Sequence, residues 1–176
     1  MRPPIEILLS EEMIRARIAQ LAEEIAPRLR DDVLLVTLMN GAFMFGADLT
    51  RALARLGKPL TLDFMVLSSY GAGTETSGRV TTRMDISIDP TGRQVLLVDD
   101  ILDSGNTLLM ASHHLRDKGA TEVLTCVLLD KPARRRVAMQ ADFIGFEIPN
   151  LFVVGFGIDY DRMFRELPFV GHLRAS

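Results

Sequence analysis

Apolar residues follow two different spacings along the first 130 residues. Between Ser10 and Pro27 they recur every three or four positions, which predicts a helix with one buried face. That face consists of Ile14, Ile18, Leu21 and Ile25. Ser10 stands where the helix N-cap is expected, and Glu11 and Glu12 after it suit the positive end of the helix dipole.

Continuous apolar runs, typical of strands that are covered on both faces, separate the helical segments. The predicted strands are 32–39, 60–71, the run that ends on Asp99 and Asp100, 121–130 and 152–159. Helices are predicted at 42–57 and from the loop after Asp103 to Lys118–Gly119. The polar stretch 72–85 has no apolar period and predicts a mobile loop or a hairpin. Strands that alternate with helices predict βαβ units, a parallel sheet and an α/β fold.

Composition limits the classes of protein to which the chain can belong. Its 176 residues, 48% of them apolar, suffice for one domain with a sizeable core. A net charge of −3 and a pI near 5.6 argue against nucleic acid and acidic membranes as partners. No apolar run reaches the ~18 residues of a membrane span, and the N-terminus lacks a signal-peptide core, so we expect a cytoplasmic protein. The single cysteine, Cys126, lies in an apolar run and is interpreted as a buried, unreactive thiol.

Polar residues with possible chemistry gather directly after the third predicted strand. Asp99 and Asp100 end this strand, and the loop 103–107 reads Asp-Ser-Gly-Asn-Thr before the next helix. Such a loop can cradle a phosphate with backbone N–H groups and hydroxyls, although a plain turn with an N-cap has the same composition. Adjacent acids beside an anion site are unfavourable alone. Vicinal ribose hydroxyls or Mg²⁺ would resolve this conflict.

This pattern resembles the signature of the type I phosphoribosyltransferases, which bind 5-phosphoribosyl-1-pyrophosphate. Further segments resemble the hypoxanthine and guanine branch of this family: GAFMFGADL, DFMVLSSYG, LLDKPARR and DFIGFEIPNLFVVGFGIDYDRMFRELPFVG. The resemblance extends from about residue 5 to residue 173, with the segments in the family's order. It implies a single domain over 1–176, with a mostly parallel twisted sheet at about 30–130. A small hood would come from about 135–173, with a contribution from the N-terminal segment.

The resemblance also implies roles for the residues after the third strand. Asp99 and Asp100 would hold the ribose hydroxyls and, directly or through water, Mg²⁺. The family commonly has Glu at the first of these positions, and Asp99 is one methylene shorter. Asp103 would be the general base or acid at purine N7, although a helix N-cap has the same geometry. The 5′-phosphate would bind to Ser104, Gly105, Asn106 and Thr107.

Residues for the purine are expected farther along the chain. Lys131 would donate to the 6-oxo group, which selects against the amino group of adenine; a lone lysine after a strand is otherwise solvated. Phe152 would stack on the base, although a core phenylalanine fits the same pattern. Val153 would meet the base through its backbone. Asp159 would lie near the base's 2-position and a second metal.

Pyrophosphate would bind to Met39, Asn40, Gly41 and Arg165. The family often has lysine where this chain has Met39, so a positive charge is lost while backbone N–H groups remain. The family's cis peptide would fall at Met39–Asn40, and the sequence leaves open whether this bond is cis. Retained activity is expected in either case.

Other residues have weaker assignments. Ser69 and Tyr70 belong to a segment that closes over the site in this family, and Arg135 is a candidate for ordering the site. His113 and His114 do not share a helix face, so they are interpreted as surface or subunit-contact residues and not as a metal pair.

The reaction implied is Mg²⁺-dependent transfer of phosphoribosyl to hypoxanthine, and to guanine, giving IMP or GMP and pyrophosphate. Two alternatives remain: a non-catalytic regulator that binds the phosphoribosyl donor, and a doubly wound phosphate-binding domain with Asp-centred phosphoryl transfer. The family forms homodimers and homotetramers, and apolar residues near Phe43 and Phe45 are candidates for such a contact.

Overall fold

The structure is a computed structural model that describes residues 4–69 and 80–173. Among these residues, a six-stranded sheet has the order β4-β3-β2-β5-β6-β7. Its strands are β2 Leu34–Met39, β3 Thr61–Ser69, β4 Val80–Met84, β5 Gln94–Leu102, β6 Glu122–Asp130 and β7 Phe143–Glu147. Only the β3–β4 pair is antiparallel. The predicted α/β class with a mostly parallel sheet is therefore confirmed.

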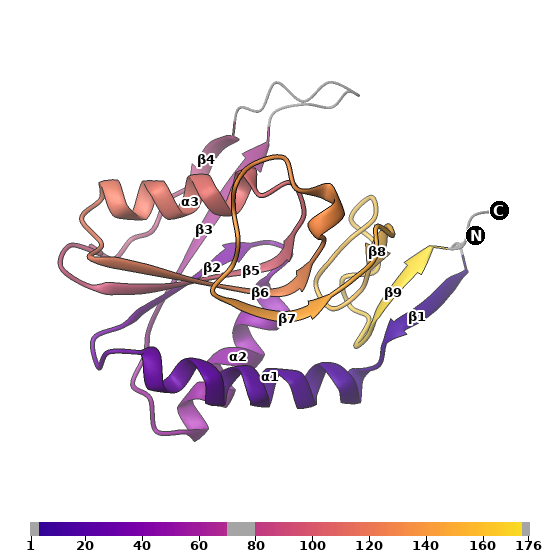
Figure 1. Ribbon diagram of the computed structural model, residues 1–176, viewed down its shortest axis with the longest axis horizontal. Helices are drawn as coiled ribbons and strands as arrows, with labels where there is room; N and C mark the ends of the chain where they lie inside the picture. The colour runs from indigo at the N-terminus through magenta and orange to yellow at the C-terminus, as the bar shows by residue number, and fades with distance from the viewer. Residues whose placement is uncertain (1–3, 70–79, 174–176) are drawn as a thin grey trace.

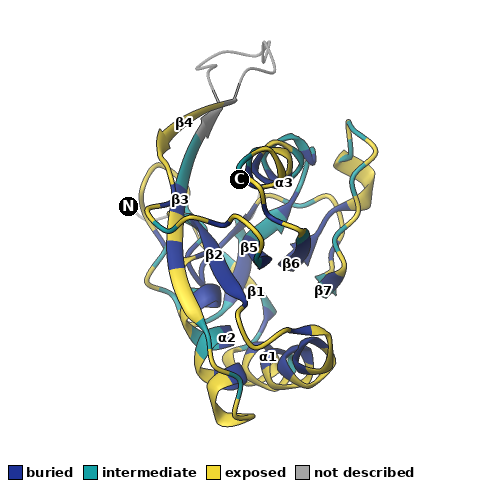
Figure 2. Ribbon diagram, turned by 90° about the vertical axis from the view of Figure 1, so that its left-hand side faces the viewer, coloured by how far each residue is buried: buried dark blue, intermediate teal, exposed yellow. Residues whose placement is uncertain are grey.

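Helices cover both faces of this sheet (Figures 1 and 2). Two of them, α1 (Glu11–Ile25) and α2 (Phe43–Arg55), lie on one face, and α3 (Asn106–Asp117) lies on the other. Short 3₁₀ helices follow as η1 (Ala26–Arg28) and η2 (Pro132–Arg134). No helix among the described residues is long and apolar enough to cross a membrane.

Alternate residues of the central strands supply two separate cores. On β5, Leu96 and Val98 pack with the residues of α1 and α2, whereas Val95 and Leu97 pack with those of α3. Both faces of the strand are therefore apolar, which explains the continuous apolar run in the sequence. The thiol of Cys126 on β6 is buried, and this burial raises its pKa well above the ordinary value.

A second, smaller sheet joins the two ends of the chain (Figure 1). Its order is β1-β9-β8, with β1 at Ile5–Leu9, β9 at Val170–Leu173 and β8 at Val153–Val154. All neighbouring strands in it are antiparallel. This sheet lies at the edge of the molecule near the carboxyl ends of the central strands (Figure 1). By contrast, β7, which falls within the expected hood range, is the edge strand of the large sheet.

Two sequence predictions need correction, and one open alternative is decided in part. The predicted strand 152–159 is wrong beyond Val154, because Gly155 and Gly157 each have φ +97° and turn the chain sharply. The stretch 72–85 contains β4, so of its two predicted forms the hairpin describes residues 80–84. Phe45 is fully buried and cannot serve a subunit contact, although Phe43 is 41% exposed.

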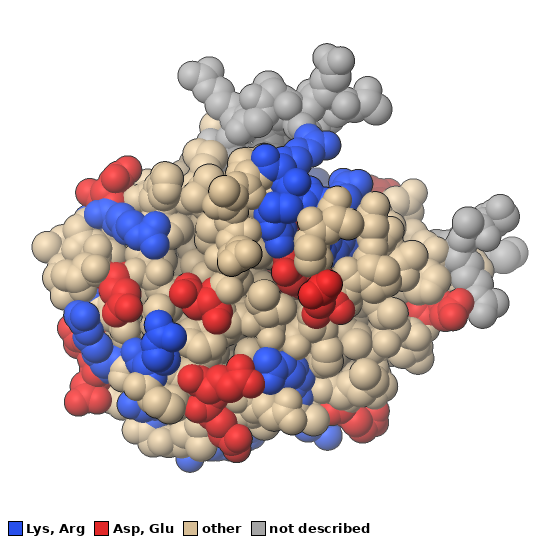
Figure 3. Space-filling model, viewed as in Figure 1, with Lys and Arg blue, Asp and Glu red and all other residues tan. Residues whose placement is uncertain are grey.

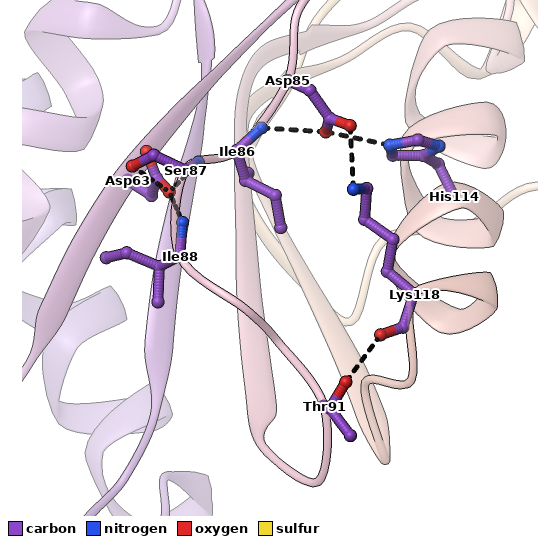
Figure 4. Close-up of polar contacts among 8 residues, drawn as sticks. All are labelled: Asp63, Asp85, Ile86, Ser87, Ile88, Thr91, His114 and Lys118. Atoms are coloured by element: carbon purple, nitrogen blue, oxygen red, sulfur yellow. Dashed lines mark hydrogen bonds and ion pairs between the residues drawn. The ribbon is translucent and has the colours of Figure 1, made fainter.

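A buried carboxylate anchors the segment after β4 to the sheet. Asp63 on β3 accepts hydrogen bonds from the backbone N–H groups of Ser87 and Ile88, at 2.7 and 2.8 Å, and from the Ser87 hydroxyl (Figure 4). The N–H of Phe64 donates to the same carboxylate at 2.8 Å. Burial by itself would raise the pKa of Asp63. The hydrogen bonds outweigh this effect, so the pKa lies below its ordinary value.

The same segment is tied to α3 by charge. Asp85 pairs with His114 and Lys118, each at 2.9 Å (Figure 4). Burial would raise the pKa of Asp85, but these two partners and a backbone N–H bond lower it overall. His114, predicted as a surface or subunit-contact residue, thus contacts its own chain and fixes the helix whose first turn forms part of the site.

Candidate active site

A cavity of about 200 Å³ opens at the carboxyl end of β5, where α3 begins. In parallel α/β sheets this edge is where ligands bind. All residues that line the cavity lie within 99–108, and they include six predicted site residues: Asp99, Asp100, Asp103, Ser104, Gly105 and Thr107. Asn106, the remaining residue of the predicted phosphate loop, is the first residue of α3.

Gly105 permits the sharp turn from the loop into α3. It is the N-cap of α3 and has φ +89°, a conformation that side chains disfavour. A Cβ there would lie 2.9 Å from Val137 Cγ2 and 3.2 Å from Met139 Cβ. The loop therefore packs directly against the segment after η2, and the first turn of α3 presents its N–H groups at the cavity.

The acid pair is held at the end of β5 by local hydrogen bonds. Asp99 Oδ1 accepts from the N–H of Asp100, and Asp100 Oδ1 accepts from the N–H of Ile101, at 2.9 and 2.8 Å. Burial raises the pKa of Asp99 well above its ordinary value, and the negative charge of Asp100 raises it further. Burial also raises the pKa of Asp100, although the charge of Arg165 opposes this. Two acids in this position favour a cation or hydroxyl donors among them.

The loop after β2 closes against this acid pair. Its Met39–Asn40 peptide bond is cis, which settles the question that the sequence left open. A Cβ at Gly41 would lie only 1.8 Å from Asp100 Oδ2, so only glycine fits there without moving the carboxylate. The loop also approaches the segment after β8: a Cβ added at Gly157 would lie only 2.0 Å from the Gly41 carbonyl oxygen. The predicted pyrophosphate loop thus touches both the acid pair and the segment after β8.

Basic side chains approach the cavity from the segment after β6, where Lys and Arg atoms gather on the surface (Figure 3). Lys131 follows β6 directly and is only 6% exposed. Burial lowers its pKa, and the nearby charge of Asp103 opposes this shift. Arg134 Nε donates to Asp103 Oδ1 at 3.1 Å. Lys131 therefore shares the neighbourhood of Asp103, and its solvated alternative is excluded.

The remaining predicted residues lie before, in and after β8. Val153 is buried in β8, whereas the Phe152 ring is 58% exposed and stands edge-on to Tyr160, with ring centroids 5.6 Å apart. The alternative of a core phenylalanine is therefore wrong. Arg165 pairs with Asp159 at 2.7 Å and donates to the Gly157 carbonyl at 2.5 Å.

The acid pair suits a hard cation such as Mg²⁺. This ion binds through one or two carboxylates, waters and substrate oxygens, and seldom through an all-protein cage. Residues 4–69 and 80–173 contain no cluster of three acidic, histidine or cysteine residues placed to hold a metal. Asp99 and Asp100 would supply protein ligands to this ion, and Asp159, the third predicted metal residue, is paired with Arg165 in this structure.

Some site residues were beyond sequence reasoning, and others lie outside the described structure. The contact of Arg134 with Asp103, the Tyr160 ring beside Phe152 and the Gly157 contact arise from tertiary packing alone. Tyr70 lies outside the described residues. Ser69 is the last residue of β3, where its backbone pairs with Val80.

Comparison with known proteins places this geometry in a family. The family model of the phosphoribosyl transferase domain matches residues 6–161. The chain belongs to the phosphoribosyltransferase family. This phosphoribosyltransferase is 44% identical over 174 residues to hypoxanthine phosphoribosyltransferase of Salmonella typhimurium, covering 97% of this chain and 96% of the relative. It is 41% identical to hypoxanthine-guanine phosphoribosyltransferase of Mycobacterium tuberculosis, covering 95% and 85% of the two chains.

Solved structures agree with these relatives. A structure of Trypanosoma cruzi hypoxanthine phosphoribosyl transferase matches with a TM-score of 0.92 and 39% identity, covering 99% of this chain and 93% of the other. A hypoxanthine-guanine phosphoribosyltransferase from Bacillus anthracis matches with a TM-score of 0.91 and 37% identity, covering 98% and 100%. The family, the fold and the enzyme class predicted from the sequence are thereby confirmed.

Proposed function

We propose that this phosphoribosyltransferase joins hypoxanthine, and also guanine, to 5-phosphoribosyl-1-pyrophosphate in purine salvage. The products are IMP or GMP and pyrophosphate. One observation carries the proposal: the loop 103–107, the acid pair and the buried Lys131 lie at one edge of the sheet. This edge combines an anion site, partners for a diol or cation, and a donor for an oxo group.

The donor substrate is held along the end of β5. Ser104, Gly105, Asn106 and Thr107 bind the 5′-phosphate through backbone N–H groups and hydroxyls. Asp99 and Asp100 accept hydrogen bonds from the ribose hydroxyls. Burial disfavours the charged form of both acids and raises their pKa, and hydroxyl donors or a cation would stabilise that form.

Magnesium is proposed as the cofactor, held by Asp99 and Asp100, with Asp159 at a second site. When bound, Mg²⁺ supplies charge neutralisation for the pyrophosphate leaving group. Pyrophosphate also contacts the backbone of Met39, Asn40 and Gly41, whose loop abuts the acid pair. Arg165 adds a planar, permanently charged fork, which it must turn from Asp159 toward the leaving group.

The purine lies between the segment after β6 and the residues at the start of β8. Lys131 donates to the 6-oxo group, and Phe152 stacks on the base. Phe152 is exposed, and its T-shaped contact with Tyr160 leaves at least one face of the Phe152 ring free of Tyr160. Val153 contacts the base through its backbone. Asp103 moves the proton at N7, and Arg134 must release its carboxylate for this step.

A homodimer or homotetramer is proposed for the assembly. Apolar side chains of β3 and α2 are exposed in the single chain, among them Phe43, Leu62 and Phe64. Light scattering of the wild-type protein and of Phe64→Glu tests this assembly: we expect the variant to dissociate, and an equal mass for both would contradict the contact. Cytoplasmic location and the absence of nucleic-acid and membrane partners remain predictions.

Pyrophosphate release tests the function. We expect turnover with hypoxanthine and guanine, little with adenine, and none after EDTA treatment until Mg²⁺ is restored. Asp103→Asn should lower kcat by about 10²–10⁴-fold while the donor still binds, because its amide cannot take the N7 proton. Donor binding without turnover on any purine would instead favour the regulator.

A further inference from the structure

The segment 131–136 donates hydrogen bonds to three consecutive carbonyl groups, that of Leu102 at the end of β5 and those of the first two residues of the loop 103–107. The Leu102 carbonyl accepts from the N–H of Lys131 at 3.0 Å and from Arg135 at 2.9 Å. The Asp103 carbonyl accepts from Arg135 at 2.5 Å, and the Ser104 carbonyl accepts from the N–H of Arg136 at 2.9 Å. Arg135 is therefore the only side chain among these three donors.

Peptide geometry gives these contacts a consequence on the opposite side of the loop. Among the described residues the only cis bond is Met39–Asn40, so the peptides after Leu102, Asp103 and Ser104 are trans. In a planar trans peptide, the C=O of one residue and the N–H of the next point in opposite directions. Carbonyls held toward the segment 131–136 therefore turn the N–H groups of residues 103–105 away from it. The cavity is lined by residues within 99–108 and by none of 131–136, as expected if these N–H groups face it.

Arg135 is itself held in one orientation. One guanidinium nitrogen faces the two carbonyls, and the other pairs with the Asp130 carboxylate at the end of β6. The side chains of Arg135 and Asp130 are 17% and 10% exposed. The Asp130 backbone is fixed as well, because its carbonyl accepts from the N–H of Ile148 at 2.9 Å. A planar fork with several donors can serve three acceptors at once, which the ammonium of lysine cannot do in the same geometry.

We propose that Arg135, oriented by Asp130, is a positioning residue that presets the N–H groups of residues 103–105, which include the phosphate-binding N–H groups of Ser104 and Gly105. It does not touch the substrate. Because Arg135 holds the carbonyls before the phosphate binds, the loop is already ordered, and binding does not have to include the entropic cost of ordering it. The inference rests on the proposed function for the identity of the anion, a 5-phosphoribosyl group.

The test compares Arg135→Met, Arg135→Lys and Asp130→Asn with Arg51→Met as a matched control. Arg51 is a surface arginine on α2 that pairs with Asp48, outside the cavity lining. Titration calorimetry with ribose 5-phosphate gives Kd without any need for turnover. Steady-state kinetics give KM separately for the phosphoribosyl donor and for hypoxanthine.

We expect Arg135→Met to raise both the Kd for ribose 5-phosphate and the donor KM about tenfold, and the hypoxanthine KM less than about twofold. Arg135→Lys should fall between this variant and the wild type, and Arg51→Met should match the wild type. Asp130→Asn keeps an oxygen that can accept from Arg135, so it should raise the donor KM less than Arg135→Met does. In the double variant, Asp130→Asn should not raise the donor KM beyond the value for Arg135→Met alone.

Unchanged donor KM and Kd, with kcat falling only as the folded fraction falls, would show a merely structural role and overturn the proposal. Equal rises of both KM values would overturn it too. If Arg135→Met does not fold, wild-type Kd values in both Arg135→Lys and Asp130→Asn would be equally contradictory. Should the wild type bind ribose 5-phosphate without turnover, the proposed function fails, while the Kd comparison still decides the role of Arg135.

Discussion

A substitution at Gly41 can displace the Asp100 carboxylate without replacing Asp100 itself. In Gly41→Ala the new Cβ would lie 1.8 Å from Asp100 Oδ2 and 2.7 Å from its Cγ, whereas real Cβ contacts essentially never fall below 3.0 Å. The carboxylate must therefore shift by more than 1 Å. Because it is the end of a side chain, it can do so without displacing the backbone.

The expected cost falls on activity and not on stability. When the Asp100 carboxylate moves, it loses its hydrogen bond from the Ile101 N–H, which contributes about 0.5–1.5 kcal/mol to stability. Replacing glycine by alanine stabilises the folded protein by about 0.4–1 kcal/mol, because it lowers the conformational entropy of the unfolded chain. The two effects oppose each other, so the free energy of unfolding should change by less than about 1 kcal/mol. A misplacement of this size costs about 10²-fold in rate, so kcat/KM for the phosphoribosyl donor should fall by about that factor.

Gly57→Ala is the matched control. Gly57 has φ +75°, and a methyl group there would have no atom within 4 Å, so alanine is strained at this position but touches nothing. We expect it to lose about 1–2 kcal/mol of stability and to keep full kcat/KM. Urea denaturation and initial pyrophosphate-release rates measure both quantities. If Gly41→Ala kept kcat/KM within about threefold, or if both variants lost activity in proportion to stability, the reasoning would be refuted.

Three further outcomes are expected. Lys131→Met should lower kcat/KM for hypoxanthine by about 10-fold or more, and it should reduce the ratio of kcat/KM for hypoxanthine to that for adenine. An unchanged ratio would contradict the 6-oxo contact. Asp63→Asn should cost about 1–3 kcal/mol of unfolding free energy at pH 7 in urea melts. The pKa of Asp63 is lower in the folded protein than the value of about 3.9 in the unfolded chain, so its contribution to stability is fully present above about pH 3.9. This contribution is lost as the pH falls through the folded pKa. The difference in unfolding free energy between the wild type and Asp63→Asn should therefore disappear in acid. Ser112→Ala should raise stability by about 1 kcal/mol in thermal melts, since the buried Ser112 hydroxyl has no hydrogen-bond partner among the described residues, and a loss of that size would show a missed partner.

The sequence predicted the centre of the fold well because its signals are local. The apolar runs of β2, β5 and β6 and the N-cap at Ser10 appear where they were expected; the Ser10 hydroxyl accepts from the Met13 N–H at 3.3 Å. The resemblance implied a small hood from both ends of the chain, but the apolar pattern did not predict its strands, because β1 pairs with β9 across nearly the whole chain and β8 has only two residues. No local pattern encodes such a pairing.

The site shows the same division. The loop 103–107 and the acid pair are contiguous in sequence, so their association could be predicted. The contact of Gly41 with Asp100 joins the ends of two strands, and that of Gly157 with Gly41 joins a third segment. Neither spacing nor residue type reveals these contacts, because glycine is selected there by space that only the folded chain defines. The cis bond at Met39–Asn40 likewise required coordinates.

The location of a bound nucleotide tests the central claim most directly. A crystal of this phosphoribosyltransferase soaked with IMP should hold the 5′-phosphate on the N–H groups and hydroxyls of residues 103–107, with both ribose hydroxyls at Asp99 and Asp100 and the 6-oxo group at Lys131. Density for the phosphate at any other place, with this loop empty at a saturating concentration, would contradict the account.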